Sequence, residues 1–98
     1  HLDGFYFEPP AVLHGRIDGE EGRLELDAET REYRWQQNGV EVVLDRDNRL
    51  VRASVQSPAD SSVRISLKNY YIMRVLLDGL MNDPGGYAAV MVRMVAKR

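Results

Sequence analysis

Hydrophobic and polar residues alternate along much of the chain up to residue 68, and this period of two is typical of half-buried β-strands. Short clusters rich in Gly, Asn, Asp and Ser interrupt the alternation, as expected at chain reversals. The clearest alternating runs are residues 12–18, 23–27, 33–37, 40–44, 49–55 and 63–68. The pattern therefore predicts an antiparallel sheet built from strands that follow one another along the chain.

The pair Asn38-Gly39 gives the clearest turn in the sequence. Both positions of a two-residue hairpin turn need positive φ, which Asn and Gly tolerate best. A turn there places Trp35 opposite Val42 and Tyr33 opposite Leu44. All four apolar side chains then share one face, so the turn chemistry and the hydrophobic pattern predict the same register.

Residues 18–22 predict an earlier turn by composition. Pairing the residues that flank a turn over 19–22 would place Ile17 opposite Leu24 and His14 opposite Asp27. Opposite charges would then face each other on the outer side of the hairpin. On this register His14 has a structural role.

A third reversal is predicted over residues 45–48. One alternative is a two-residue turn centred on Asp47-Asn48. The other is a four-residue loop, which avoids placing the like-charged Arg46 and Arg49 opposite each other. The two-residue version predicts the pairs Leu44 with Val51, Val42 with Ala53, and Val40 with Val55.

A helix is predicted over about residues 69–82. Asn69 is a favoured N-cap, and the Asn-Asp-Pro-Gly-Gly run at 82–86 cannot continue a helix. Between them Arg74 and Asp78 are the polar positions, and apolar residues cover most of the remaining circumference. A helix that covers one face of a sheet needs an apolar stripe of only roughly 100°. We therefore expect one side to pack on the sheet and another to be covered by a second part of the chain or by a partner.

The two ends of the chain are also apolar. The aromatic run at 5–7 precedes Pro9-Pro10 and is expected to anchor an arm on the core, with an aromatic ligand platform as the alternative. Residues 87–98 predict a valine-rich buried strand, with a helix as the alternative. The predicted fold is α+β: a curved, mostly antiparallel sheet of six or seven strands with one helix packed across it, in a single domain over residues 1–98.

Composition limits the class of protein. A chain of 98 residues with 44% hydrophobic and 29% charged residues is ordinary for one globular domain. The lack of cysteine excludes a disulfide scaffold, a thiolate zinc site and a thiol nucleophile, but leaves the compartment open. We take a cytoplasmic location as the working expectation, with the periplasm or a longer protein as alternatives. No apolar run reaches the roughly 18 residues of a membrane span.

Charge is unevenly distributed along the chain. Residues 1–45 carry four basic and eleven acidic side chains, whereas residues 46–98 carry nine basic and four acidic ones. On the predicted register, four basic residues project from the outer face of the sheet and could bind nucleic acid or another anionic ligand. These residues are Arg34, Arg52, Arg64 and Lys68. The aromatic rings that would stack on bases point to the other face, which argues against nucleic acid.

No motif for catalysis stands out. A Ser-His-Asp set around His14 can be drawn on paper, but no serine occupies a G-x-S-x-G turn. Residues 45–48 resemble the start of a calcium loop, yet the glycine and glutamate that such a loop needs are missing. We therefore expect no catalytic residue, metal site or cofactor, and lean against an enzyme.

The excess of apolar helix surface predicts a non-catalytic protein-interaction or assembly domain that binds a protein partner or further copies of itself. One alternative is the anionic-ligand surface above. Another is a small-molecule carrier or enzyme with a pocket between helix and sheet, near Trp35 and Tyr70. The residues predicted to form the protein contact are Tyr71, Met73, Arg74, Leu77, Tyr87 and Met91.

Overall fold

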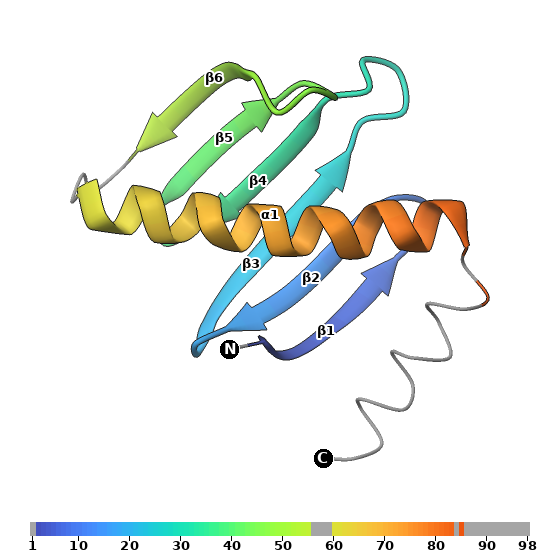
Figure 1. Ribbon diagram of the computed structural model, residues 1–98, viewed down its shortest axis with the longest axis horizontal. Coiled ribbons are helices and arrows are strands. Elements are labelled where there is room, and N and C mark those ends of the chain that lie inside the picture. The colour runs from blue at the N-terminus through green and yellow to red at the C-terminus, as the bar shows by residue number, and fades with distance from the viewer. Residues whose placement is uncertain (1, 56–59, 84, 86–98) are drawn as a thin grey trace.

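The computed structural model describes residues 2–55, 60–83 and 85. Six strands form one antiparallel sheet in which each strand pairs with the next along the chain. A single described helix crosses one face of this sheet (Figure 1). The elements are β1 (Leu2–Glu8), β2 (Val12–Ile17), β3 (Glu20–Leu26), β4 (Tyr33–Gln37), β5 (Val40–Leu44), β6 (Leu50–Val55) and α1 (Asp60–Asn82). The predicted α+β fold, with one helix packed across an antiparallel sheet, is confirmed.

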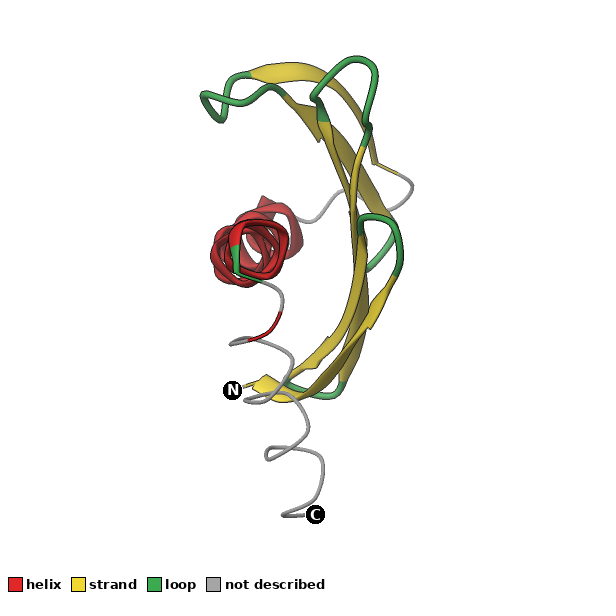
Figure 2. Cartoon of the chain, turned by 90° about the vertical axis from the view of Figure 1, so that its right-hand side faces the viewer, coloured by secondary structure: helices red, strands yellow, loops and turns green. Residues whose placement is uncertain are grey.

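The sheet is strongly curved, and α1 lies on its concave side (Figure 2). The inward positions alternate with outward ones, as in β4, where every second residue from Tyr33 to Gln37 is buried. Trp35 is fully buried near the middle of the interface, and its ring meets the ring of Tyr70 edge to face at 6.4 Å between centroids. Apolar burial between sheet and helix therefore holds the two layers together.

The hairpin between β4 and β5 has the predicted form. Asn38 and Gly39 both adopt positive φ, 54° and 71°. Trp35 lies opposite Val42, and Tyr33 lies opposite Leu44. The predicted register is therefore confirmed, and the turn type and the hydrophobic pattern both favour it.

The hairpin between β2 and β3 corrects the sequence analysis. Its turn is the two-residue pair Asp18-Gly19, with φ of 51° and 80°, so Ile17 lies opposite Glu20 and His14 opposite Arg23. Gly22, which the sequence analysis placed in the turn, belongs to β3. There the Trp35 ring occupies the space of a side chain, and a Cβ on Gly22 would lie 2.3 Å from its Cη2. The error in register is even, so the predicted inner and outer faces survive.

The turn between β5 and β6 lies where it was predicted, but it has neither of the two predicted lengths. The N–H of Asp45 donates to the carbonyl of Arg49 at 2.9 Å, which closes a loop of three residues, and Asn48 in this loop has a φ of 62°. An irregularity in the ladder then shifts the register near Val43 and Leu44. The pairs Val42 with Ala53 and Val40 with Val55 are confirmed, whereas Leu44 pairs with Leu50 and not with Val51.

The start of α1 is the largest correction to the predicted elements. Residues 63–68, predicted as a strand, are helical, as are residues 60–62 of the predicted loop. Asn69 is not an N-cap but a buried residue in the body of the helix, where its Nδ2 donates to Oε1 of Gln37 at 2.7 Å. Residues 57–59 and the predicted terminal strand lie outside the described part of the chain. Within that part, no helix is long and apolar enough to cross a membrane.

Candidate protein-interaction surfaces

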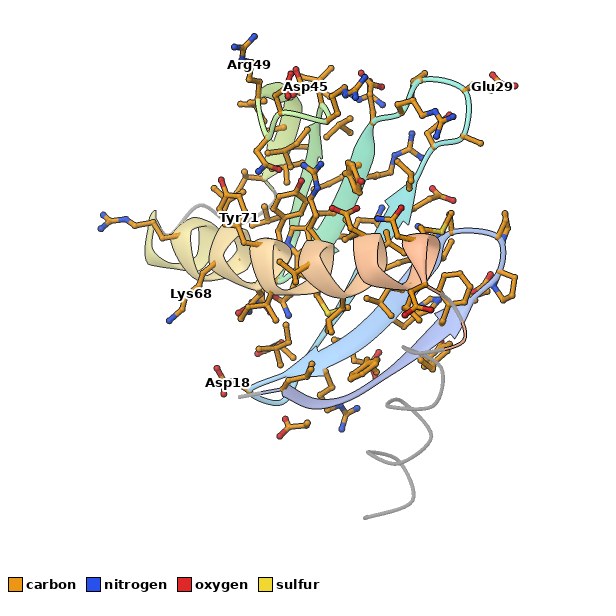
Figure 3. All side chains as sticks on the ribbon, turned by 45° about the vertical axis from the view of Figure 1, so that its right-hand side comes forward. Asp18, Glu29, Asp45, Arg49, Lys68 and Tyr71 are labelled. Atoms are coloured by element: carbon orange, nitrogen blue, oxygen red, sulfur yellow. The ribbon has the colours of Figure 1, made fainter. Side chains whose placement is uncertain are left out.

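The residues predicted to contact a partner occupy very different positions. Met73 and Leu77 are fully buried against the sheet and offer no surface. Tyr71 is 48% exposed and lies on the surface of α1 (Figure 3). Tyr87 and Met91 lie outside the described residues. The structure therefore brings Met73 and Leu77 into the core and leaves Tyr71 on the surface.

Arg74 makes an intramolecular contact between α1 and the loop after β5. Its guanidinium lies 3.9 Å from the centre of the Tyr33 ring, and its Nε contacts the Asp78 carboxylate at 3.3 Å. Its Nη2 donates to the carbonyl of Arg46 at 2.7 Å, and Nη1 has a further acceptor in the side chain of Asn48. The guanidinium of Arg74 thus makes its described contacts within the chain.

The hydroxyl groups around Arg74 complete this polar cluster. The Tyr33 hydroxyl donates to Oδ1 of Asp78 at 2.5 Å, and the Tyr70 hydroxyl donates to Oδ1 of Asn48 at 2.9 Å. Burial raises the pKa of Tyr33, and its hydrogen bond to the Asp78 carboxylate adds to that rise. Burial also raises the pKa of Tyr70. Both phenols therefore stay neutral and hydrogen-bonded at neutral pH.

An apolar stripe remains exposed on the side of α1 that faces away from the sheet. Its members, which we call the outer stripe, are Tyr71, Ile72 and Val75, with exposed fractions of 48%, 39% and 66%. The exposed Lys68 lies one turn before them and Gly79 one turn after. The residues predicted from the sequence include Tyr71 but not Ile72 or Val75, because apolar residues cover most of the helix and do not by themselves distinguish the exposed face. The buried residues 66, 69, 70, 73, 77 and 80 follow the helical period and form the opposite face.

A second exposed apolar region lies on β6, which forms one edge of the sheet. Residues 50–54 are all exposed, including the large side chains of Leu50 and Val51. The opposite edge, β1, carries an irregularity between Leu2 and Gly4 and is followed directly by Pro9 and Pro10. Another strand could therefore pair more easily with the edge of β6 than with the edge of β1.

The convex face of the sheet is polar. At its β1 edge the ring of Tyr6 stacks on the ring of His14, with 4.4 Å between centroids. The Nε2 of His14 lies 2.9 Å from a Glu8 carboxylate oxygen. The predicted contact between His14 and Asp27 is wrong, because Asp27 accepts hydrogen bonds from backbone N–H groups of the 28–32 loop. Those bonds lower the pKa of Asp27.

A shallow, open depression of about 500 Å³ lies on this convex face. Its side chains are mostly polar and partly paired with each other, as where Nε2 of Gln36 donates to Glu41 at 3.1 Å. Across the described ranges, no group of three or more His, Cys, Asp or Glu residues could hold a metal ion. The depression is lined by His14, Glu21, Gly22, Arg23, Gln36, Gln37, Asn38, Gly39, Val40, Glu41 and Ser54.

The four basic residues of the predicted anionic-ligand surface do not share one face. Arg34 and Arg52 flank Val43 on the convex side, as predicted. Arg64 and Lys68 lie on α1, on the other side of the sheet, because residues 63–68 are helical. In addition, Nη1 of Arg34 lies 3.6 Å from a carboxylate oxygen of Glu25.

The predicted pocket between helix and sheet is filled by side chains where the structure describes it. Trp35, Tyr70 and Met73 are fully buried there. The indole N–H of Trp35 donates to Oγ of Ser66 at 2.8 Å. These residues form the core, and the depression described above lies on the opposite face of the sheet.

Comparison of the chain with protein-family models, with curated protein sequences and with solved structures finds no match. The function is therefore argued from the surfaces of this chain alone.

Proposed function

We propose that this chain is a non-catalytic assembly domain that associates with copies of itself through the outer stripe of α1. The observation that supports this proposal is the exposure of Tyr71, Ile72 and Val75 on the helix face opposite the sheet. The buried face of the same helix already packs on the concave side of the sheet. The stripe is therefore apolar surface beyond what the described core uses.

Burial of the stripe would favour association. Apolar surface removed from water contributes roughly 25 cal/mol per Å², and a twofold contact buries the same residues in both copies. Only the part that exceeds the entropic cost of association becomes binding free energy. A stripe of only three exposed apolar side chains fits a weak, concentration-dependent contact better than a permanent dimer.

The stripe is compatible with a second copy in an antiparallel crossing. A crossing centred between Ile72 and Val75 places each of these side chains against the other one in the second copy. The same crossing brings Lys68 next to Gly79 of the second copy and close to its Asp78. The glycine allows a close approach, and the opposite charges at each end of the contact are complementary.

The test is sedimentation velocity of the purified chain over a wide concentration range. We expect the weight-average mass of the wild type to rise with concentration. Val75→Glu should weaken this association roughly tenfold or more, because it places a carboxylate in an apolar contact. Met81→Glu is the matched control: Met81 is an exposed apolar residue of the same helix but lies outside the stripe.

Two results would contradict the proposal. One is a wild-type chain that stays monomeric up to the highest concentration reached. The other is an association that Val75→Glu and Met81→Glu weaken equally, since a general effect of added charge would then explain it.

A further inference from the structure

The geometry points to a second contact between copies, in which the free edge of β6 pairs with β6 of another chain in one defined register. This inference rests on the proposed function as an assembly domain and adds a surface separate from the outer stripe. The described residues place no strand beyond β6. A free edge of this kind can accept another strand.

The hairpin geometry shows which backbone groups are free at this edge. The two-residue turn makes Gln37 and Val40 a hydrogen-bonded pair, and such pairs alternate with non-bonded pairs along an antiparallel ladder. Val42 therefore directs its backbone groups to β4, whereas Glu41 and Val43 direct theirs to β6. Their partners Ser54 and Arg52 bond back to β5. By the same alternation, the N–H and C=O groups of Ala53 and Val55 point outward from the edge.

A register centred on Ala53 satisfies these outward groups in both copies. If Ala53 lies opposite Ala53 of the second copy, the two residues exchange both of their backbone hydrogen bonds. Arg52 then lies opposite Ser54 on the convex face, and apolar residues meet on the concave face. A shift of one residue would oppose inner and outer faces. A shift of two residues toward the start of β6 would place Arg52 directly against its own copy, which like charges disfavour.

The chosen register also creates a charge pair across the new junction. Glu41 and Ser54 are neighbours on the convex face, so Arg52 of the second copy lies next in the same row. Strands are 4.7–4.9 Å apart, so the backbones of Glu41 and the second Arg52 are about 10 Å apart with only a serine between them. A long arginine side chain can span this gap. In the described part of the chain Arg52 makes no ion pair, and Glu41 receives one hydrogen bond, from Gln36, at Oε2.

The other edge of the sheet is less suited to such pairing. The ladder of β1 is irregular near Asp3, and Pro9 and Pro10, which have no backbone N–H to donate, directly follow the strand; both features discourage addition of a strand. β6 contains no proline, and its single charged residue is the one that the register pairs. The inference therefore commits to a symmetric contact between two β6 strands.

Charge reversal tests the register. Arg52→Glu and Glu41→Arg should each weaken the β6 contact roughly fivefold, because each places like charges across the junction. The double variant restores the pair with its signs exchanged and should recover most of the association. Sedimentation velocity measures all three against the wild type, with circular dichroism as the check of folding.

Cross-linking supplies a second, independent test. The chain has no cysteine, so Ala53→Cys introduces the only thiol. In the inferred register two such residues have Cα atoms about 5.5 Å apart, within the range of a disulfide. The matched control is Val51→Cys, which is also exposed; in this register Val51 lies four residues along the junction from Val51 of the second copy. Mild oxidation should trap a dimer of Ala53→Cys and little of Val51→Cys.

The outcomes separate this inference from the proposed function. Recovery by the double variant together with selective cross-linking at position 53 supports the β6 contact. Equal cross-linking at 51 and 53, or no recovery in the double variant, overturns it. If association persists unchanged in Arg52→Glu but is lost in Val75→Glu, the outer stripe stands and the β6 contact falls. A chain that is monomeric throughout overturns both.

Discussion

At the scale of single residues, two positions of the sheet favour glycine because a large core side chain fills the space that a Cβ would occupy. A Cβ at Gly22 would meet the rigid Trp35 ring, and a Cβ at Gly15 would meet the flexible end of Met73 at 2.6 Å. Gly22→Ala should therefore destabilise the fold by about 3 kcal/mol, the upper end of overpacking costs. Gly15→Ala should cost less, because the methionine can move. Urea denaturation measures both.

The control for these variants is Gly85→Ala, since no atom of the described residues lies within 4 Å of a Cβ built there. It should leave the free energy of unfolding nearly unchanged. A cost at Gly22 no larger than the cost at Gly85 would mean that the indole ring does not occupy the space assigned to it.

Ser66 gives a second prediction at this scale. Its Oγ accepts the indole N–H of Trp35 in a fully buried position. Ser66→Ala would leave this donor without an acceptor and should cost about 1–3 kcal/mol of stability. Ser54→Ala, on the exposed strand β6, is the control. Equal effects of the two substitutions on the denaturation midpoint would refute the role of this hydrogen bond.

The same residues show what the sequence can and cannot predict. The turn at Asn38-Gly39 could be predicted from the sequence alone, because two adjacent residues that tolerate positive φ between alternating runs indicate a two-residue hairpin turn. The role of Gly22 could not be predicted in this way, since it depends on contact with a tryptophan thirteen residues away. Asn69 was misread for a similar reason: a favoured capping residue is also a good buried partner when an amide such as Gln37 faces it.

At the scale of elements, Arg74 joins α1 to the loop between β5 and β6. Arg74→Met keeps much of the apolar stem but removes the guanidinium from Asp78 and from the carbonyl of Arg46. We expect a loss of about 1.5–3 kcal/mol, the range for hydrogen bonds to charged groups. The exposed Arg64→Met is the matched control. Hydrogen exchange should show faster opening of the loop in the first variant, and no difference between the variants would contradict this role.

The loop itself predicts a dependence on pH. The N–H of Arg49, and to a smaller degree that of Asp47, lowers the pKa of Asp45 below its usual 3.8. A lowered folded pKa means that the ionised carboxylate stabilises the fold above the unfolded pKa, and that this contribution is lost as pH falls through the folded value. Asp45→Asn should therefore have a lower Tm than the wild type at pH 7, and the two should converge below pH 4. A constant difference at all pH values would argue against this linkage.

The elements that sequence analysis misplaced have a common physical cause. Residues 63–68 alternate as a strand would, yet they are helical, and the polar residues Ser66 and Asn69 face the sheet. These polar residues hide the helical period of the buried positions, which becomes visible only when their partners Trp35 and Gln37 are known. The correctly predicted β4–β5 pairs depend on turn chemistry close in sequence, whereas the pairs Val42 with Ala53 and Val40 with Val55 were correct because an irregularity in the ladder compensates for the different turn.

At the scale of the whole molecule, the two proposed contacts lie on different surfaces and each would be symmetric. A chain with two distinct twofold contacts links into species larger than a dimer, either closed or extended. The wild type should therefore exceed dimer mass at high concentration, whereas Val75→Glu and Arg52→Glu should each need a higher concentration than the wild type to do so. Light scattering coupled to size exclusion measures this, and a wild-type mass that saturates at two copies would show that only one contact operates.

The order of the strands also governs how the molecule can be made. Every strand of this sheet pairs with its neighbour in sequence, so hairpins can form one after another as a ribosome releases the chain. The helix that covers the concave face comes after all six strands. During synthesis Trp35 and its neighbours would thus stay open to water until α1 emerges, and the last part of the described fold to be made is the part that closes it.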